Sequence, residues 1–192
     1  MIKEEKMSKL FFVVGFSGSG KTSLYRKLKS EYSERVYFPK TYTTRAPRSE
    51  EENSHEYIFV SKENFVKIRQ NTSQWDEDKI HGILYGMDIK NVHDVLNGGK
   101  LVVIMNIYPN IDILRKMLVL FDAYTPNLLY ILSNQKDRLH RIMIRSKNDA
   151  SRISCEHESV ITDLVEIYGG HVIYNTGSIE PTYNAYRDYI LG

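Results

Sequence analysis

A glycine-rich segment near the N-terminus is the strongest chemical signal in the chain. Residues Gly15-Phe-Ser-Gly-Ser-Gly20-Lys21-Thr22 match the pattern G-x-x-x-x-G-K-S/T in full. Glycines let a backbone fold around a phosphate with N–H groups directed inward, and the helix that follows directs its positive end at the same anion. We expect Lys21 to reach the β- and γ-phosphates and the Thr22 hydroxyl to bind Mg²⁺. The segment therefore predicts a nucleoside triphosphate site.

A second segment combines hydroxyl groups with arginines. It reads Thr41-Tyr-Thr-Thr-Arg45-Ala-Pro-Arg48. Arginine binds phosphate through two parallel hydrogen bonds, so it fixes orientation as well as supplying charge. Pro47 keeps the segment extended, because the residue before a proline avoids the helical region. These features suit a second anion, although the segment by itself is also compatible with a solvated basic loop.

A third basic group lies on a predicted helix from Gln135 to Arg145. Arg141 and Arg145 are four residues apart and therefore share one helix face, and Arg152 follows after a short polar loop. Positioned arginines stabilise the charge that develops in phosphoryl transfer, and closure of a lid excludes water. The alternative is a basic helix face that is paired with acids.

The elements that must position these groups follow an alternating order. Short apolar runs predict buried strands, and most of them are followed by residues at helical spacing. The predicted strands of the core are Leu10–Val14, Val36–Phe38, Leu101–Ile104, Leu128–Leu132 and His171–Tyr174. The predicted helices span residues 21–34, 88–98, 110–120, 135–145, about 153–167 and 181–190. This alternation predicts an α/β fold with a parallel sheet and right-handed crossovers.

The stretch from 39 to 93 differs in character from its surroundings. It has few long apolar runs, a short predicted strand at Tyr57–Val60, and Ser61 as a candidate N-cap of a helix through Gln70. We therefore expect an inserted lobe at 39–93. The core would then comprise 1–38 and 94–192, with a lid at about 141–153.

Composition excludes several classes of protein. The 192 residues carry a formal net charge of +2, which is too balanced to predict nucleic-acid or membrane-surface binding. The one cysteine excludes an internal disulfide and a multi-cysteine zinc site. The N-terminal residues are charged and lack the apolar segment of a signal peptide. We expect a cytoplasmic protein without membrane or nucleic-acid partners, and the oligomeric state stays open.

Taken together, these motifs resemble the guanylate kinase family, which transfers phosphate from ATP to GMP. The resemblance covers Phe12–Ser23, Thr43–Arg48, Glu51, Tyr57–Ser61, Leu84–Gly86, the arginines near 141 to 152, and Asn175. It implies a phosphate-loop core with an inserted nucleoside monophosphate-binding lobe and a short lid. It also implies direct in-line transfer from MgATP to GMP or dGMP, yielding ADP and GDP or dGDP, within purine nucleotide metabolism. The implied partners are therefore small nucleotides, with Mg²⁺ and ATP as cofactor and phosphate donor.

The resemblance also implies residue roles, position by position. The implied ATP-binding residues are Gly15, Ser17, Gly18, Ser19, Gly20, Lys21, Thr22, Ser23 and Asn175, with Thr22 as the metal ligand. The implied GMP-binding residues are Thr41, Arg45, Arg48, Glu51, Tyr57, Asp76 and Tyr85. The implied catalytic residues are Lys21, Arg141, Arg145 and Arg152.

Asp76 stands where the family has a glutamate that reads the edge of guanine. A carboxylate suits this role because guanine presents N1–H and N2–H₂ donors. A register shift of one residue would make Glu77 the reader instead, and a third interpretation is a solvated acidic run at Asp76–Asp78.

The chain departs from the family at three further positions. Met105 and Ile107 occupy the expected places of two acids, with Asn106 between them, and Met87 replaces a hydroxyl that contacts the base. Apolar side chains cannot bind a hard cation. The changes leave open an altered base preference, slow turnover, or a compensating acid such as Asp88 or Asp112. They also leave open a kinase of this fold with another nucleotide or phospho-ribose acceptor, and a catalytically weak binding domain.

Overall fold

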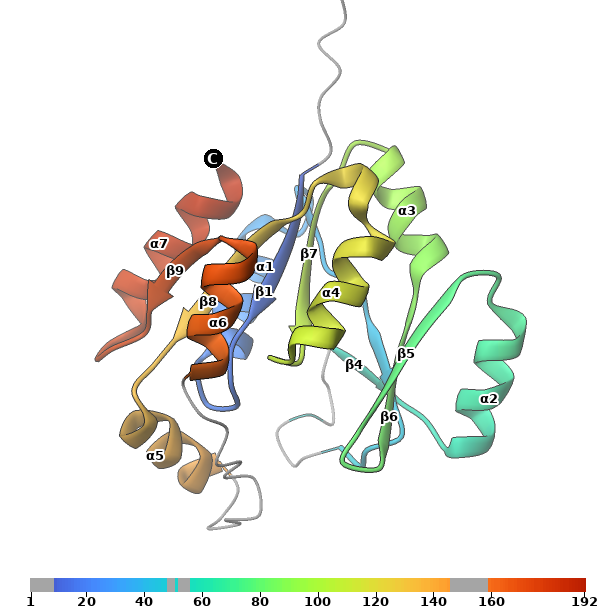
Figure 1. Ribbon diagram of the computed structural model, residues 1–192, viewed down its shortest axis with the longest axis horizontal. Coiled ribbons are helices and arrows are strands. Elements are labelled where there is room, and N and C mark those ends of the chain that lie inside the picture. The colour runs from blue at the N-terminus through green and yellow to red at the C-terminus, as the bar shows by residue number, and fades with distance from the viewer. Residues whose placement is uncertain (1–8, 48–50, 52–55, 146–158) are drawn as a thin grey trace, which may run out of the picture. The chain divides into compact units, whose positions relative to one another are not determined.

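The computed structural model describes residues 9–47, 51, 56–145 and 159–192, without the side chains of residues 106, 145 and 159–162 (Figure 1). The chain divides into two compact units. One contains Val36–Val102, and the other contains Leu10–Arg35 together with Val103–Gly192.

A parallel sheet has the strand order β2-β7-β1-β8-β9. The strands are β1 (Leu10–Val14), β2 (Val36–Tyr37), β7 (Leu101–Ile107), β8 (Asn127–Leu132) and β9 (His171–Tyr174). All five residues of β1 are buried, because its continuous apolar sequence is covered on both faces. The predicted parallel α/β sheet is confirmed.

Alternation along β1 shows which helices cover each face of the sheet. The ring of Phe11 lies edge-on to Tyr189 of α7 (Ile179–Leu191), with centroids 5.7 Å apart. The next residue, Phe12, contacts Phe121 at the end of α4 (Ile111–Leu120) on the opposite face, with centroids 5.9 Å apart. Helix α1 (Lys21–Tyr32) packs against α7, and α6 (Ser159–Tyr168) packs against β8. Helices therefore cover both faces of this sheet (Figure 1).

Polar caps set the start of several helices. Ser61 accepts from the backbone N–H of Asn64 at the start of α2 (Lys62–Asn71), as the sequence predicts. Asp88 caps α3 (Ile89–Asn97) in the same way through Asn91. Helix α5 spans Gln135–Arg145, and a short 3₁₀ turn, η1, spans Asp122–Tyr124. Local side-chain chemistry thus made these helix boundaries predictable.

The unit Val36–Val102 contains a second, mixed sheet with the order β4-β3-β6-β5. Its strands are β3 (Thr41–Thr43), β4 (Tyr57–Phe59), β5 (Trp75–Ile80) and β6 (Ile83–Asp88). Strands β3 and β4 are parallel, and β6 is antiparallel to both β3 and β5. The β5–β6 hairpin turns at His81 and Gly82, which both have positive φ, as a type I′ turn requires. Helix α2 packs Phe65 edge-on against Trp75.

Candidate active site

The glycine-rich loop lies between the end of β1 and the start of α1, inside one compact unit. Gly18 and Gly20 have φ values of 79° and 99°, in the left-handed region that favours glycine. A Cβ atom on Gly20 would also lie 2.2 Å from Nδ2 of Asn175. Backbone conformation and space therefore both require glycine at this position.

Lys21 points back into the loop from the first turn of α1. Its Nζ donates to the carbonyl of Phe16 at 3.1 Å and to the carbonyl of Gly15. Its Nζ also lies 3.5 Å from Oγ of Ser19. The ammonium group is thus held against the loop backbone, where it adds positive charge to the place expected for a phosphate.

Asn175 joins the loop to two other elements. The residue is 2% exposed, and its Nδ2 donates to the carbonyl of Ser19 at 2.8 Å. Its Oδ1 accepts from the hydroxyl of Thr182 at 3.3 Å, and its backbone N–H donates to Leu132. Asn175 therefore holds the loop in place, and its direct contact with ATP stays a prediction.

Helix α5 brings Arg141 to the same loop. Its Nη1 donates to the carbonyl of Gly18 at 3.1 Å and to Oγ of Ser133 at 3.0 Å. Arg145 is the last residue of α5, and its side chain lies outside the described part of the structure. Arg152 and the rest of the expected lid beyond residue 145 also lie outside it. Arg141 is thus the one predicted lid arginine whose contacts the described residues include.

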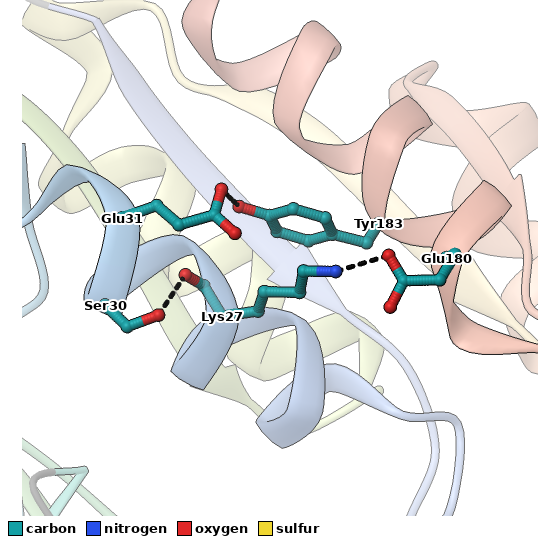
Figure 2. A network of polar contacts seen from close by, with 5 residues as sticks. All are labelled: Lys27, Ser30, Glu31, Glu180 and Tyr183. Carbon is teal, nitrogen blue, oxygen red and sulfur yellow. Dashed lines mark hydrogen bonds and ion pairs between the residues drawn. The ribbon is translucent and has the colours of Figure 1, made fainter.

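A polar network attaches α1, the helix that begins at the loop, to α7 (Figure 2). Lys27 forms an ion pair with Glu180 and places its Nζ 4.4 Å from the centroid of the Tyr183 ring. The Tyr183 hydroxyl donates to Glu31, and burial together with this carboxylate raises the pKa of Tyr183. Ser30 donates to the backbone carbonyl of Lys27 at 2.8 Å. The network thus links α7 to the helix whose first turn carries Lys21 and Thr22.

The predicted acceptor residues belong to the other unit, where strand register decides which of them share a face. Thr41 is opposite Tyr57, and Thr43 is opposite Tyr85. Residues directly opposite each other in a sheet point to the same side, as do residues two apart along a strand. Asp78 is opposite Tyr85, so Asp76 points to that side as well. Thr41, Tyr57, Asp76 and Tyr85 therefore form one face, which we call the acceptor face.

Glu77 points to the opposite side of the sheet. Its Oε2 accepts from Nε1 of Trp75 at 2.9 Å, and its Oε1 pairs with Nη1 of Arg69 of α2 at 3.1 Å. Of the two acids that the sequence left as base readers, Asp76 is the one on the acceptor face. Met87 is directly opposite Asp76 and is buried, so a thioether borders this carboxylate.

Arg45 follows β3 and is fixed by an acid and two rings. Its Nη1 lies 2.9 Å from Oε2 of Glu51, and the two side chains are 10% and 11% exposed. Its guanidinium carbon lies 5.3 Å from the ring centroids of both Tyr57 and Phe59. Burial lowers the pKa of Arg45, but the hydrogen bond and charge of Glu51 outweigh that effect and raise it. The site thus holds a permanent, oriented cation. Arg48 lies outside the described residues.

Phe59 is a residue of this site that the sequence argument missed. It follows Tyr57 by two positions in β4 and so lies on the same face. The alternation of side chains along a strand, which puts every second residue on one face, could have identified Phe59 from the sequence.

The positions where the resemblance expects acids are core positions. Met105 is 7% exposed and Ile107 is 4% exposed. The Tyr186 hydroxyl donates to the sulfur of Met105 at 3.1 Å, and burial raises the pKa of this tyrosine. A carboxylate at either place would be a buried charge, which the apolar residues avoid.

Asp88 and Asp112, the acids that could compensate for the two missing ones, both lie at the starts of helices. Asp88 accepts the capping hydrogen bond of α3, and Asp112 lies exposed in the first turn of α4. Among the described residues, no group of three or more histidines, cysteines or acids could hold a metal ion. The loop hydroxyl of Thr22 nevertheless fits Mg²⁺, because this ion usually takes one or two protein ligands and completes its shell with phosphate oxygens and water.

The part of the chain that the structure describes contains no helix long and apolar enough to span a bilayer.

Comparison with known proteins agrees with this geometry. The sequence pattern of the family described as "Guanylate kinase" matches residues 7–191. A guanylate kinase of Campylobacter jejuni is 31% identical over 140 residues, which cover 73% of this chain and 66% of that protein, just under two thirds of its length. A guanylate kinase of Wolinella succinogenes is 32% identical over 168 residues, covering 85% of this chain and 74% of that protein.

A solved guanylate kinase structure has the same fold as this chain. The crystal structure of guanylate kinase from Anaplasma phagocytophilum superposes with a TM-score of 0.67 at 19% identity, covering 96% of this chain and 86% of that one. With the loop, the acceptor face and the sequence match in agreement, the chain belongs to the guanylate kinase family.

Proposed function

We propose that this protein transfers the γ-phosphoryl group of MgATP to GMP or dGMP, forming ADP and GDP or dGDP. The observation that carries the proposal is the acceptor face, where the register puts Asp76 with Thr41, Tyr57 and Tyr85. A phosphate loop alone would not identify the acceptor. A carboxylate and a hydroxyl for a base, beside a fixed arginine for a phosphate, match a guanine nucleotide.

In this proposal the triphosphate occupies the loop from Gly15 to Ser23. The Lys21 ammonium leaves the loop carbonyls for the β- and γ-phosphates, whose charged oxygens are stronger acceptors. Thr22 would be the protein ligand of Mg²⁺, which, when bound, neutralises charge on the phosphate oxygens. Ser17 and Ser19 of the loop and Ser23 in the first turn of α1 would add contacts to ATP, and Asn175 holds the loop through the Ser19 carbonyl.

The acceptor occupies the 39–93 lobe. Arg45 and Arg48 bind its phosphate, Glu51 orients Arg45, and the hydroxyls of Tyr57 and Tyr85 complete the phosphate contacts. The Asp76 carboxylate accepts from N1–H and N2–H₂ of guanine, and the Thr41 hydroxyl provides a further contact to the base. These roles assign a function to each of the four residues that define the acceptor face.

Catalysis in this proposal is positioning and charge stabilisation. An oxygen of the acceptor phosphate attacks the γ-phosphorus in line, and the oxygen that bridges to the β-phosphate leaves with the bonding electrons as ADP. No side chain has to act as a nucleophile. Arg141, Arg145 and Arg152, the arginines of the lid at about 141–153, stabilise the charge of the transferred group. A cytoplasmic location, where both nucleotides are available, belongs to the same proposal.

The test measures ADP release from MgATP with GMP, dGMP, AMP, CMP, UMP and dTMP, using Lys21→Ala as the blank. The proposal predicts turnover with GMP and dGMP that exceeds every other acceptor and disappears in the blank. Preference for another nucleotide would refute the assignment of Asp76 and Thr41. Equal ADP release without an acceptor would refute the transferase reaction.

A further inference from the structure

Three consecutive carbonyls of the phosphate loop each accept a hydrogen bond from a side chain outside the loop. Arg141 donates to Gly18 and Asn175 donates to Ser19. The carbonyl of Ser17 accepts from Nε of Arg138 at 3.3 Å. Arg141 and Asn175 already have expected roles in the reaction, whereas Arg138 has none.

Arg138 is a buried arginine that packs against the phosphate loop. The residue is 6% exposed, which is unusual for an arginine. Its guanidinium carbon lies 4.5 Å from the ring centroid of Phe16, the second residue of the loop motif. A Cβ atom on Gly18 would lie 2.7 Å from the backbone oxygen of Arg138, so the first turn of α5 touches the loop directly.

These contacts bear on the conformation of the loop. The carbonyl and the N–H of one peptide group point in opposite directions, because the group is planar and trans. The bond from Arg138 to the Ser17 carbonyl therefore fixes the direction of the Gly18 N–H, and packing of the guanidinium on the Phe16 ring holds that side chain against α5. Inward N–H groups are what such a loop offers to a phosphate.

We propose that Arg138 is a positioning residue for the triphosphate, acting through the Ser17 carbonyl and the Phe16 ring. In this role Arg138 contacts the loop from the side away from the expected phosphate and holds the backbone in the conformation that binds it. The proposal rests on triphosphate binding by the loop, which belongs to the proposed function.

The test compares Arg138→Met with Arg138→Lys and with Lys136→Met. Methionine keeps an unbranched apolar chain but removes the donor, and lysine retains a charge over the ring and one donor group. Lys136→Met removes the same charge from an exposed position on the same helix. Calorimetric titration gives the dissociation constants of MgATP and GMP, thermal unfolding reports folding, and steady-state kinetics separate KM from kcat.

We expect Arg138→Met to weaken MgATP binding about 10-fold, as for loss of one charge-assisted hydrogen bond. The KM for ATP rises with it, while the GMP dissociation constant and kcat at saturating ATP change less than about twofold. Arg138→Lys recovers part of the loss, and Lys136→Met binds as the wild type does. Phe16→Leu weakens ATP binding as well. In the double variant Phe16→Leu/Arg138→Met, the loss of ATP-binding free energy is smaller than the sum of the two single losses.

Two results would overturn the role of Arg138 and leave the proposed function standing. One is a folded Arg138→Met with unchanged ATP affinity. The other is an equal loss of GMP and ATP affinity in both Arg138 variants, which marks a general structural role. Failure of the wild-type protein to bind MgATP would instead overturn the proposed function together with this inference.

Discussion

The acceptor face predicts opposite consequences for two neighbouring acids of β5. Asp76 shares the face with Thr41 and Tyr85, whereas Glu77 contacts Trp75 and Arg69 on the other side. Asp76→Asn and Glu77→Gln each remove one charge and almost no volume. The pair therefore tests side-chain direction, with each variant as the control of the other.

The magnitude follows from the hydrogen bonds at stake. Hydrogen bonds to charged groups contribute about 1.5–3 kcal/mol, and an amide in place of the carboxylate loses at least one of the two bonds to guanine. We therefore expect Asp76→Asn to lower kcat/KM for GMP roughly 10- to 150-fold, with the KM for ATP nearly unchanged.

Glu77→Gln has a different expected effect. Its ion pair with Arg69 joins side chains that are 45% and 31% exposed, so the pair contributes about 0–1 kcal/mol to stability. Glutamine also keeps an oxygen for Nε1 of Trp75. We expect a small loss of stability and little change in kcat/KM for GMP.

The assay is initial-rate ADP formation at varied GMP and saturating MgATP, with thermal unfolding of each variant. A larger loss of kcat/KM in Glu77→Gln than in Asp76→Asn would refute the register argument. Equal losses in both variants would show that overall charge, rather than position on the face, governs acceptor binding.

Three further predictions concern other groups. Arg45→Ala should raise the KM for GMP and leave the ATP dissociation constant unchanged in calorimetry, and it should also lower the unfolding temperature because the mostly buried Glu51 loses its ion pair with Arg45. Asn175→Ala should cost about 1–3 kcal/mol in denaturant unfolding and raise the KM for ATP, since the Ser19 carbonyl loses its donor. Burial raises the pKa of Tyr130 to about 12 from 10.0, so between those pH values the unfolded chain releases a proton that the folded protein keeps. Stability should therefore fall as pH rises from 10 to 12, and less steeply in Tyr130→Phe, as alkaline unfolding curves would show.

Sequence patterns predicted the core well for a physical reason. Strands such as β1 and β8 are continuous apolar runs, and caps such as Ser61 and Asp88 act within four residues. Both signals are local, so the chain itself displays them. The phosphate loop is local in the same sense.

The acceptor site was only partly predictable because it depends on pairing between distant segments. The residues of β5 read Trp-Asp-Glu-Asp-Lys-Ile and lack apolar alternation, so neither the strand nor the side of Asp76 was evident. The contact between Arg138 and Phe16 joins residues 122 positions apart, which no local pattern records. The direction of Glu77 likewise became clear only from its contacts with Trp75 and Arg69.

Transfer of labelled phosphate tests the central claim most directly. The protein is incubated with ATP labelled at the γ-phosphate and with GMP, and the products are separated alongside a Lys21→Ala control. The account predicts that the label moves to the β-phosphate of GDP, with none on the protein and none in the control. Label released as free phosphate, attached to the protein, or retained in ATP while GMP is present would contradict direct transfer between the two nucleotides.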